Sequence, residues 1–196
     1  MADSKLPGNG GAQIDDRIED QKEEPFGRSR EDYLHTGLEL LAESGPRALT
    51  AVRLAAELEA TTGSFYWHFK NVAEFRRAVR EYWRHVVVPE VITEALRQAE
   101  AEGASAIDKL GPLVWQTGIY RYDDAMRRWA QEDAEAAKAL QEADAWRGRV
   151  MTAMMGNTST AADVTELIGA AWRGSSGMRD AKRRAKLIAM TTRGLA

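Results

Sequence analysis

The sequence predicts an all-α protein with an N-terminal three-helix head, residues 28–85, and a second helical domain, residues 86–196. Apolar residues recur at intervals of three and four through most of the chain after residue 28, which is the spacing of one helix face. Glycine, proline or a capping side chain separates these stretches. The sequence lacks alternating apolar stretches around a tight turn, the signature of a β-hairpin.

The composition excludes several classes of protein. The chain has 196 residues, a formal net charge of −3 and no cysteine, so a disulfide framework and thiolate chemistry are excluded. Its apolar run before Pro89 is far too short for a membrane span, and its first residues do not form a secretory signal. We therefore expect a cytoplasmic protein without a membrane partner.

Residues 1–27 carry three Lys or Arg against seven Asp or Glu, and their apolar residues are too sparse to form a buried stripe. This composition is typical of a disordered, acidic tail. Residues 28–85 carry nine Lys or Arg against eight Asp or Glu. Any cationic surface on the head therefore depends on where its charges lie.

The first helix of the head is predicted to begin at Ser29, with Asp32 completing its cap, and to end at Gly45-Pro46. Residues 50–70 then predict two short helices joined by a tight turn, capped by Thr50 and Thr61. Their apolar positions are Ala51, Leu54, Ala55 and Leu58, then Phe65 and Phe69. Two helices in this arrangement form a helix-turn-helix.

The second of these helices suits a nucleic acid. Thr62, Gly63 and Ser64 make its first turn small and polar, whereas a bulky first turn would hold the backbone away from the base edges of a major groove. Its free N–H groups and positive dipole end suit phosphate. Tyr66 and Trp67 are not needed for packing by the stripe of phenylalanines.

The run L-A-A-E-L-x-x-T-T-G-S-F-Y-W-H-F-K, with a helix on either side, resembles the DNA-binding head of the tetracycline-repressor (TetR) family. The resemblance covers about residues 28–83. It implies a homodimer that binds a palindromic double-stranded DNA operator and is released by a small-molecule effector. The family usually has glycine at the turn position held by Glu59, where the backbone tends to need positive φ, and another residue there costs about 1 kcal/mol.

The resemblance also implies roles for single residues. Four are expected to face bases: Thr62, Gly63, Ser64 and Trp67. Five are expected to hold phosphates: Thr50, Thr61, Tyr66, His68 and Lys70. Packing between helices is the alternative for Tyr66 and His68. Arg28 and Arg30 are further candidates for backbone contacts. The fourth helix, capped by Asn71 and ending near Val86, would tie the head to the ligand domain.

The second domain is predicted to be helical, with a helix closing at Gly103, one capped by Ser105, a break over residues 118–124, a long helix after Asp133, a loop over residues 156–159 and two final helices. Aromatic and methionine side chains can line an apolar cavity, although they also fill cores. The expected ligand-binding residues are Trp115, Ile119, Tyr120, Met126, Trp129 and Met151. By the resemblance, the last two helices form the dimer interface, through Leu167, Ile168, Ala171, Trp172, Leu187, Ile188 and Thr191.

An enzyme is not expected. The three histidines, His35, His68 and His85, lie in separate predicted helices without the spacing of a metal site, and no nucleophile or phosphate-loop motif is present. Asp123 and Asp124 beside Arg127 read as surface ion pairs. No catalytic residue, metal or cofactor is therefore predicted. The alternatives to a repressor are a helical ligand-binding or interaction module without specific DNA binding, a ligand-independent regulator and an activator.

Overall fold

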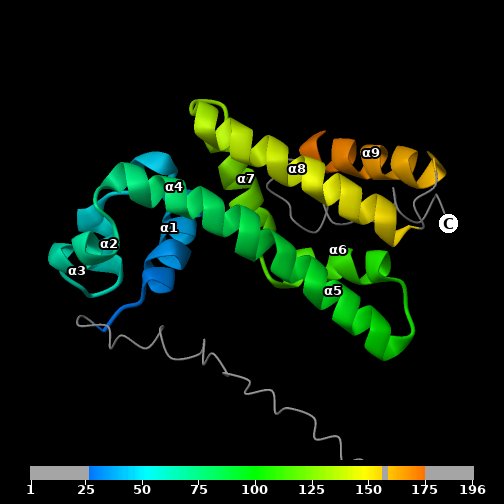
Figure 1. Cartoon of the computed structure of the whole chain (residues 1–196), viewed down its shortest axis with the longest axis horizontal. Helices are drawn as coiled ribbons and strands as arrows, with labels where there is room; N and C mark the ends of the chain where they lie inside the picture. The colour runs from blue at the N-terminus through cyan, green and yellow to red at the C-terminus, as the bar shows by residue number, and fades with distance from the viewer. Residues whose placement is uncertain (1–26, 156–158, 175–196) are drawn as a thin grey trace, which may run out of the picture.

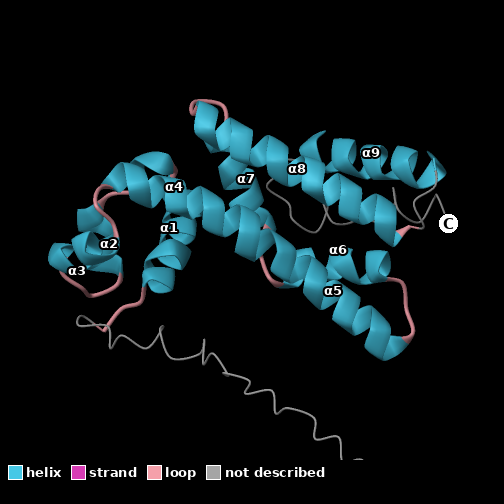
Figure 2. Ribbon diagram, viewed as in Figure 1, coloured by secondary structure: helices cyan, strands magenta, loops and turns pink. Residues whose placement is uncertain are grey.

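The structure, a computed structural model, describes residues 27–155 and 159–174, and within these ranges it contains helices and loops without a strand (Figures 1 and 2). The predicted all-α class is confirmed. The elements are α1 (Arg30–Ser44), the 3₁₀ turn η1 (Pro46–Ala48), α2 (Ala51–Glu57), α3 (Thr62–His68), α4 (Val72–Tyr82), the π-helical turn η2 (Trp83–Val87), α5 (Val88–Glu102), α6 (Ala106–Gln116), α7 (Tyr120–Trp129), α8 (Ala134–Met154) and α9 (Ser159–Gly174).

Most of the predicted helix starts are capped as expected. The side-chain oxygens of Ser29, Thr50, Thr61, Asn71 and Asp133 each accept the backbone N–H three residues further on. Each of these bonds satisfies a donor that the first turn of a helix leaves open. Ser105 occupies the cap position of α6, but its side chain makes no capping hydrogen bond.

The head consists of α1, α2 and α3 packed against α4 (Figure 1). The rings of Phe65 in α3 and of Phe69, the residue that follows α3, meet the ring of Phe75 on α4 with centroids 5.4 and 5.0 Å apart. These three side chains are fully buried, together with Tyr33 and Leu38 of α1. The aromatic stripe on α3 therefore anchors this short helix to α1 and α4 and leaves its other face outside.

At Gly37, α1 lies so close to α4 that there is no room for a side chain. A Cβ atom at this position would lie 2.6 Å from Cζ of Phe75 and 3.0 Å from Cγ2 of Val79. Phe75 is itself enclosed by the other rings of the head, so it has little freedom to move aside. The crossing of the two helices therefore depends on glycine at this position.

The turn between α2 and α3 contains Glu59, which adopts φ of 53°. Among the described residues, no other residue except glycine has a positive φ. The resemblance predicted a positive φ at this position. A side chain in the left-handed region is strained against its own backbone. The turn nevertheless closes, since the N–H of Ala60 donates to the carbonyl of Ala55 at 2.8 Å.

The predicted end of the fourth helix near Val86 is wrong. The helix passes from α4 through η2 into α5 without a loop, so the predicted boundary between residues 85 and 86 lies inside a continuous helical segment (Figure 1). Pro89 lies in the first turn of α5, immediately after the π turn. A proline ring clashes with the carbonyl four residues earlier, and the wider π turn opens the backbone at this point. Here Val88 donates to the carbonyl of Trp83, five residues back.

The predicted break over residues 118–124 is shorter in the structure. Gly118, with φ of 71°, makes the turn, and α7 already begins at Tyr120. Acidic side chains such as Asp123 are favourable in the first turn of a helix because they face its positive dipole end. The break between α6 and α7 is therefore only three residues long, from Thr117 to Ile119.

Helix α7 lies in the middle of the described molecule and contacts α1 of the head (Figure 1). The hydroxyl of Tyr122 donates to the carboxylate of Glu39, which also accepts from Arg121 at 3.0 Å. Arg128 donates to the carbonyl of Ala42 at 3.3 Å. Three side chains of one helix thus hold the outer face of α1.

The remaining helices form the other end of the molecule, where α5 packs on α6 and α8 packs on α9 (Figure 1). Within the described ranges, none of the helices is long and apolar enough to span a bilayer. Residues 1–26, part of the predicted 156–159 loop and the predicted last helix lie outside the described residues.

Replacing Gly37 by alanine tests the crossing of α1 and α4. We expect Gly37→Ala to lower the free energy of unfolding by about 1–3 kcal/mol, because the added methyl group overpacks a site that cannot yield. The control is Gly148→Ala in α8, where a Cβ would meet only Cγ2 of Thr165, at an ordinary contact distance of 3.9 Å. That change is expected to raise the stability by about 0.5–1 kcal/mol. Urea unfolding followed by circular dichroism measures both, and equal effects would contradict the assignment.

Replacing Glu59 by glycine tests the strain in the turn. Glu59→Gly is expected to raise the free energy of unfolding by about 0.5–1 kcal/mol, since glycine adopts positive φ without the steric penalty and part of that gain is lost to a more flexible unfolded chain. The matched control is Ala56→Gly, an exposed helical position in α2. It should lose about 0.5–1 kcal/mol. A loss of stability in both variants would show that the turn is unstrained.

Candidate DNA interface and ligand cavity

The face of α3 that the phenylalanines leave outside is largely exposed. The side chains of Tyr66 and Trp67 are 54% and 48% accessible, although both are large and apolar enough to be buried. Thr61, Thr62 and Gly63 are also exposed and form the start of the same helix. Exposed aromatic residues on a short helix that is otherwise anchored by its packing indicate a surface for contact with a partner.

Ser64 is not part of this surface, which corrects one expected base contact. Its side chain is fully buried, because it lies on the same side of α3 as Phe65 and faces the head. Its backbone N–H donates to the cap oxygen of Thr61 at 3.2 Å. The small side chain at this position serves the packing of the helix rather than its outer face.

His68 is engaged inside the head. Its Nε2 atom lies 2.9 Å from the carbonyl oxygen of Arg28, so the ring donates this hydrogen bond from Nε2–H. Arg28 in turn donates from Nε to the carbonyl of Leu58 at 2.8 Å, at the end of α2. These bonds connect the segment before α1 to the turn and to the end of α3. His68 therefore fixes the position of α3, which is the packing role that was the alternative to a phosphate contact.

Exposed cations surround the helix-turn-helix. They are Arg30, Arg47, Arg53, Lys70 and Arg77. Arg30 lies over the ring of Phe69, with Cζ 5.0 Å from the centroid, and Arg53 donates to Ser44 at 3.1 Å. The N–H of Lys70 donates to the carboxylate of Glu74 at 2.9 Å, which fixes the backbone from which the Lys70 side chain projects.

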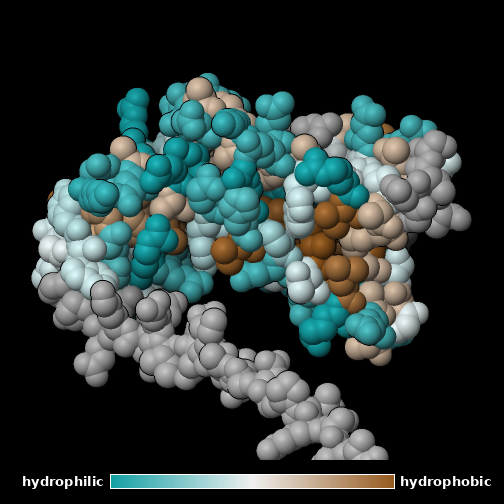
Figure 3. All heavy atoms as spheres, viewed as in Figure 1, coloured by the Kyte–Doolittle hydropathy of each residue, from teal (hydrophilic) through white to brown (hydrophobic). Residues whose placement is uncertain are grey.

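A cavity of about 650 Å³ lies between the helices at the other end of the molecule. Its lining comes from α5 through to α9, with apolar side chains mainly from α5 and α6 and charged ones mainly from α7 and α8. Figure 3 shows apolar atoms gathered in the hollow below α8, over α5 and α6. A cavity of this size with a few convergent polar groups is typical of a small-molecule site.

Three of the six expected ligand residues line this cavity, namely Ile119, Tyr120 and Met151. The other three do not. Met126 and Trp129 are buried in the core on the side of α7 that faces the head and α4, so their expected contact with a ligand is wrong. Trp115 packs against the ring of Tyr120, with ring centroids 4.6 Å apart, but does not itself line the cavity. Helical spacing does not distinguish a residue that fills the core from one that borders a space.

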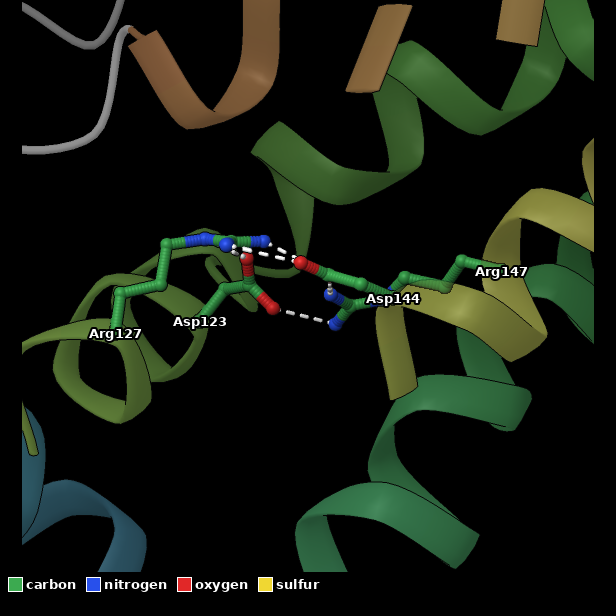
Figure 4. Close-up of polar contacts among 4 residues, drawn as sticks. All are labelled: Asp123, Arg127, Asp144 and Arg147. Atoms are coloured by element: carbon green, nitrogen blue, oxygen red, sulfur yellow. Dashed lines mark hydrogen bonds and ion pairs between the residues drawn. The ribbon is translucent and has the colours of Figure 1, made fainter. Parts of the chain in front are cut away.

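The charged wall of the cavity is a closed network that we call the ion ring: Asp123 and Arg127 of α7 with Asp144 and Arg147 of α8 (Figure 4). Arg127 donates to both oxygens of Asp144 at 3.0 and 2.9 Å and to Asp123 at 3.2 Å. Arg147 donates to Asp144 at 3.1 Å and also to Asp123. Each guanidinium therefore bridges both carboxylates.

The electrostatics of the ion ring favour the charged form of Arg127. Burial by itself lowers the pKa of Arg127, but the nearby carboxylates of Asp123 and Asp144 outweigh this effect and raise the pKa above its usual value. Sequence reasoning placed Asp123 and Arg127 at the surface. The sequence shows the spacing of four between Asp123 and Arg127. Their partners on α8 are 17 and 24 residues away in the chain, and no local pattern indicates that they meet.

The ion ring also touches the helix that leads to the head. The guanidinium of Arg147 lies over the ring of Trp83, with Cζ 5.2 Å from the centroid. Trp83 belongs to the π turn η2 and is fully buried. One residue of the cavity wall therefore packs directly on the continuous segment between α4 and α5.

A smaller cavity of about 290 Å³ lies between α1 and the rest of the molecule, lined among others by His35, Tyr82 and Tyr122. The hydroxyl of Tyr82 donates to Glu31 at 3.0 Å. Burial and this carboxylate raise the pKa of Tyr82 to about 12. Burial and the bond to Glu39 likewise raise the pKa of Tyr122. Both hydroxyls therefore stay protonated donors at neutral pH, and they hold α1 to α4 and to α7.

The expected dimer face is described only in part. Leu167 of α9 is exposed, as an interface residue of a single chain should be, and Ala171 is half-buried. Ile168 is buried within the chain itself, so it is not available to a partner and its expected role is corrected. The side chain of Trp172 and residues Leu187, Ile188 and Thr191 lie outside the described part. Among the described residues, no cluster of three or more His, Asp or Glu could hold a metal ion.

Comparisons with known proteins agree with this geometry. The family "Bacterial regulatory proteins, tetR family" matches residues 34–79, which include the helix-turn-helix. The class G tetracycline repressor protein of Vibrio anguillarum is 33% identical over 91 residues. That match covers 46% of this chain and 41% of the repressor, so the chain spans less than half of the length of this relative.

A solved structure shares the fold. It is Thermus thermophilus FadR, described as a TetR family transcriptional repressor in complex with lauroyl-CoA. The TM-score is 0.51 at 17% identity, over 85% of this chain and 93% of that one. The head of this chain, residues 34–79, is thus similar to the TetR family of bacterial regulatory proteins, and the chain shares its all-helical fold with a solved structure described as a member of that family.

Proposed function

We propose that this protein is a homodimeric repressor that binds a palindromic DNA operator and leaves it when a small, largely apolar molecule enters the cavity. The observation that carries the proposal is the division of α3 into a buried phenylalanine face and an exposed face with Tyr66 and Trp67. An anchored helix with an exposed side of this kind can lie in a major groove. The protein would act in the cytoplasm, where bacterial DNA is found.

Base contacts are assigned to the exposed start and middle of α3. Thr62, Gly63 and Trp67 lie on its outer face, and the small first turn allows the backbone to approach the base edges. Trp67 offers apolar contact to a thymine methyl group and one N–H donor.

Phosphate contacts are assigned to the two helix starts and to the end of α3. Thr50, Thr61 and Tyr66 are exposed and offer hydroxyls, and Lys70 offers a charge. The hydroxyls of Thr50 and Thr61 already accept from the backbone, and each can still donate to a phosphate oxygen. His68 positions α3 through its bond to Arg28.

Release from DNA is assigned to α7. This helix lines the cavity with Tyr120 and Asp123 and holds α1 through Arg121 and Tyr122. A ligand that shifts α7 would therefore shift the head. By linkage, the ligand must weaken DNA binding by the same factor by which DNA weakens ligand binding. The similar FadR structure is described as a complex with lauroyl-CoA, which supports a small-molecule effector.

Dimerisation is assigned to the C-terminal helices, beginning with the exposed Leu167 and Ala171 of α9. The predicted partners Trp172, Leu187, Ile188 and Thr191 would complete the face. A two-fold axis there would present two heads to half-sites about 34–36 Å apart.

The direct test is selection of bound duplexes from a random pool by the purified protein, followed by sequencing, over a series of salt concentrations. An enriched palindrome with half-sites about one helical turn apart is the expected result. Weak binding without sequence preference would overturn the proposal and favour a ligand-binding or interaction module. Transcription from a promoter carrying the palindrome then distinguishes a repressor from an activator.

Replacing Lys70 tests the phosphate assignment. Lys70→Ala should weaken binding to all sequences alike and flatten the slope of log K against log salt by about one, because one phosphate contact is lost. The control is Lys138→Ala, which removes the same charge from an exposed position of α8. It should leave the slope unchanged. A change of base preference in Lys70→Ala would assign Lys70 to a base instead.

A further inference from the structure

We propose that the molecule bound in the large cavity is an amphipathic organic anion, whose carboxylate-type head takes the place of the Asp144 carboxylate on Arg127 and Arg147. This inference rests on the proposed function and names the class of its effector. It follows from the composition of the two cavity walls, the charge balance of the ion ring and the unequal exposure of its members.

The two walls of the cavity suit the two ends of such a molecule. One wall is aliphatic, with Val88, Val91, Ile92, Leu110, Val114 and Ile119. It can bury an alkyl or ring system through the hydrophobic effect. The ion ring of α7 and α8 lines the same cavity. A ligand long enough to fill the cavity would therefore meet both.

The ion ring is already neutral, because two carboxylates balance two guanidinium groups. The two further charged residues of the lining, Arg149 and Glu166, are exposed and opposite in sign. Adding a charged head group without removing one of these charges would leave an unpaired charge away from water, which is costly. A charged ligand must therefore exchange with one member of the ring.

Asp144 is the member that can leave most readily. Its side chain is 25% exposed, whereas that of Asp123 is 3% exposed. Arg147 is about as exposed as Asp144 but also lies on the ring of Trp83, and it would lose that contact if it were displaced. Arg127 is more buried and bonded to both carboxylates. Exchange of the anion is therefore easier than exchange of a cation.

The geometry that Asp144 leaves behind selects a carboxylate. Arg127 presents two N–H groups to the two oxygens of Asp144, and Arg147 adds a third donor. A ligand carboxylate reproduces this paired arrangement and keeps the site neutral. A hydroxyl group offers one acceptor oxygen and no charge, and an ammonium group offers only donors.

The exchange would also act on α7. Asp144 belongs to α8, and its bonds to Arg127 are a main link between α8 and α7 at the cavity. A ligand in its place would bind Arg127 of α7 and Arg147 of α8, and the direct bonds from Arg127 to α8 would be replaced by bonds to the ligand. The other side of α7 holds α1 through Glu39, so a shift of α7 against α8 would move the head.

The test compares head groups on one alkyl chain. Calorimetric titration of the full chain at neutral pH with octanoate, octanol and octylamine should show octanoate binding about tenfold more tightly than octanol, and octylamine most weakly. Asp144→Asn should widen the gap between octanoate and octanol by about a further tenfold, because the internal competitor is gone. Asp108→Asn, on α6 and outside the cavity lining, should leave the gap unchanged.

Equal binding of octanoate and octanol, or tightest binding of octylamine, would overturn the inference, and so would an unchanged gap in folded Asp144→Asn. The wild-type series does not depend on the folding of any variant. A preference for octanoate without loss of operator DNA would support the inference and overturn the proposed function. A selected operator together with no preference for octanoate would do the reverse.

Discussion

The position of α7 between α1 and α8 is the constraint on which the rest of the structure depends. On one side, Arg121 and Tyr122 bind Glu39 of α1. On the other side, Asp123 and Arg127 bind α8 through the ion ring (Figure 4). Successive residues of one helix thus reach the head and the cavity wall. The continuous segment from α4 to α5 adds a covalent connection, and Arg147 on Trp83 joins the two routes.

The ion ring contributes more to fixing how α7 lies against α8 than to the free energy of folding. Buried ion pairs often contribute less than well-packed apolar side chains would, since both partners lose their hydration. Removing one partner alone is far more costly, because it leaves the other charge unpaired. Asp123, Arg127, Asp144 and Arg147 satisfy one another, and this arrangement favours one position of α7 against α8, because any other position would leave a charge unpaired.

The head shows how a short helix is held in place. Two turns of helix have little stability of their own in water, so the stability of α3 comes from packing. Phe65 and Phe69 supply the buried side, His68 fastens the end of α3 to Arg28, and Arg28 is bonded in turn to Leu58 at the end of α2. This arrangement leaves Tyr66 and Trp67 outside on a rigid support. The strained residue Glu59 lies in the turn that sets the angle between α2 and α3.

The sequence by itself determined the helical class, most helix starts and the helix-turn-helix, because caps and apolar spacing are local properties of the chain. It also located the positive φ of Glu59, through the family resemblance. Only the tertiary structure decided which side chains face a partner, a cavity or the core. Ser64, Met126 and Trp129 are buried, although their types and spacing also fitted a binding surface. The ion ring was hidden for the same reason: it joins residues of two helices, and the pairing of distant segments depends on how those helices pack.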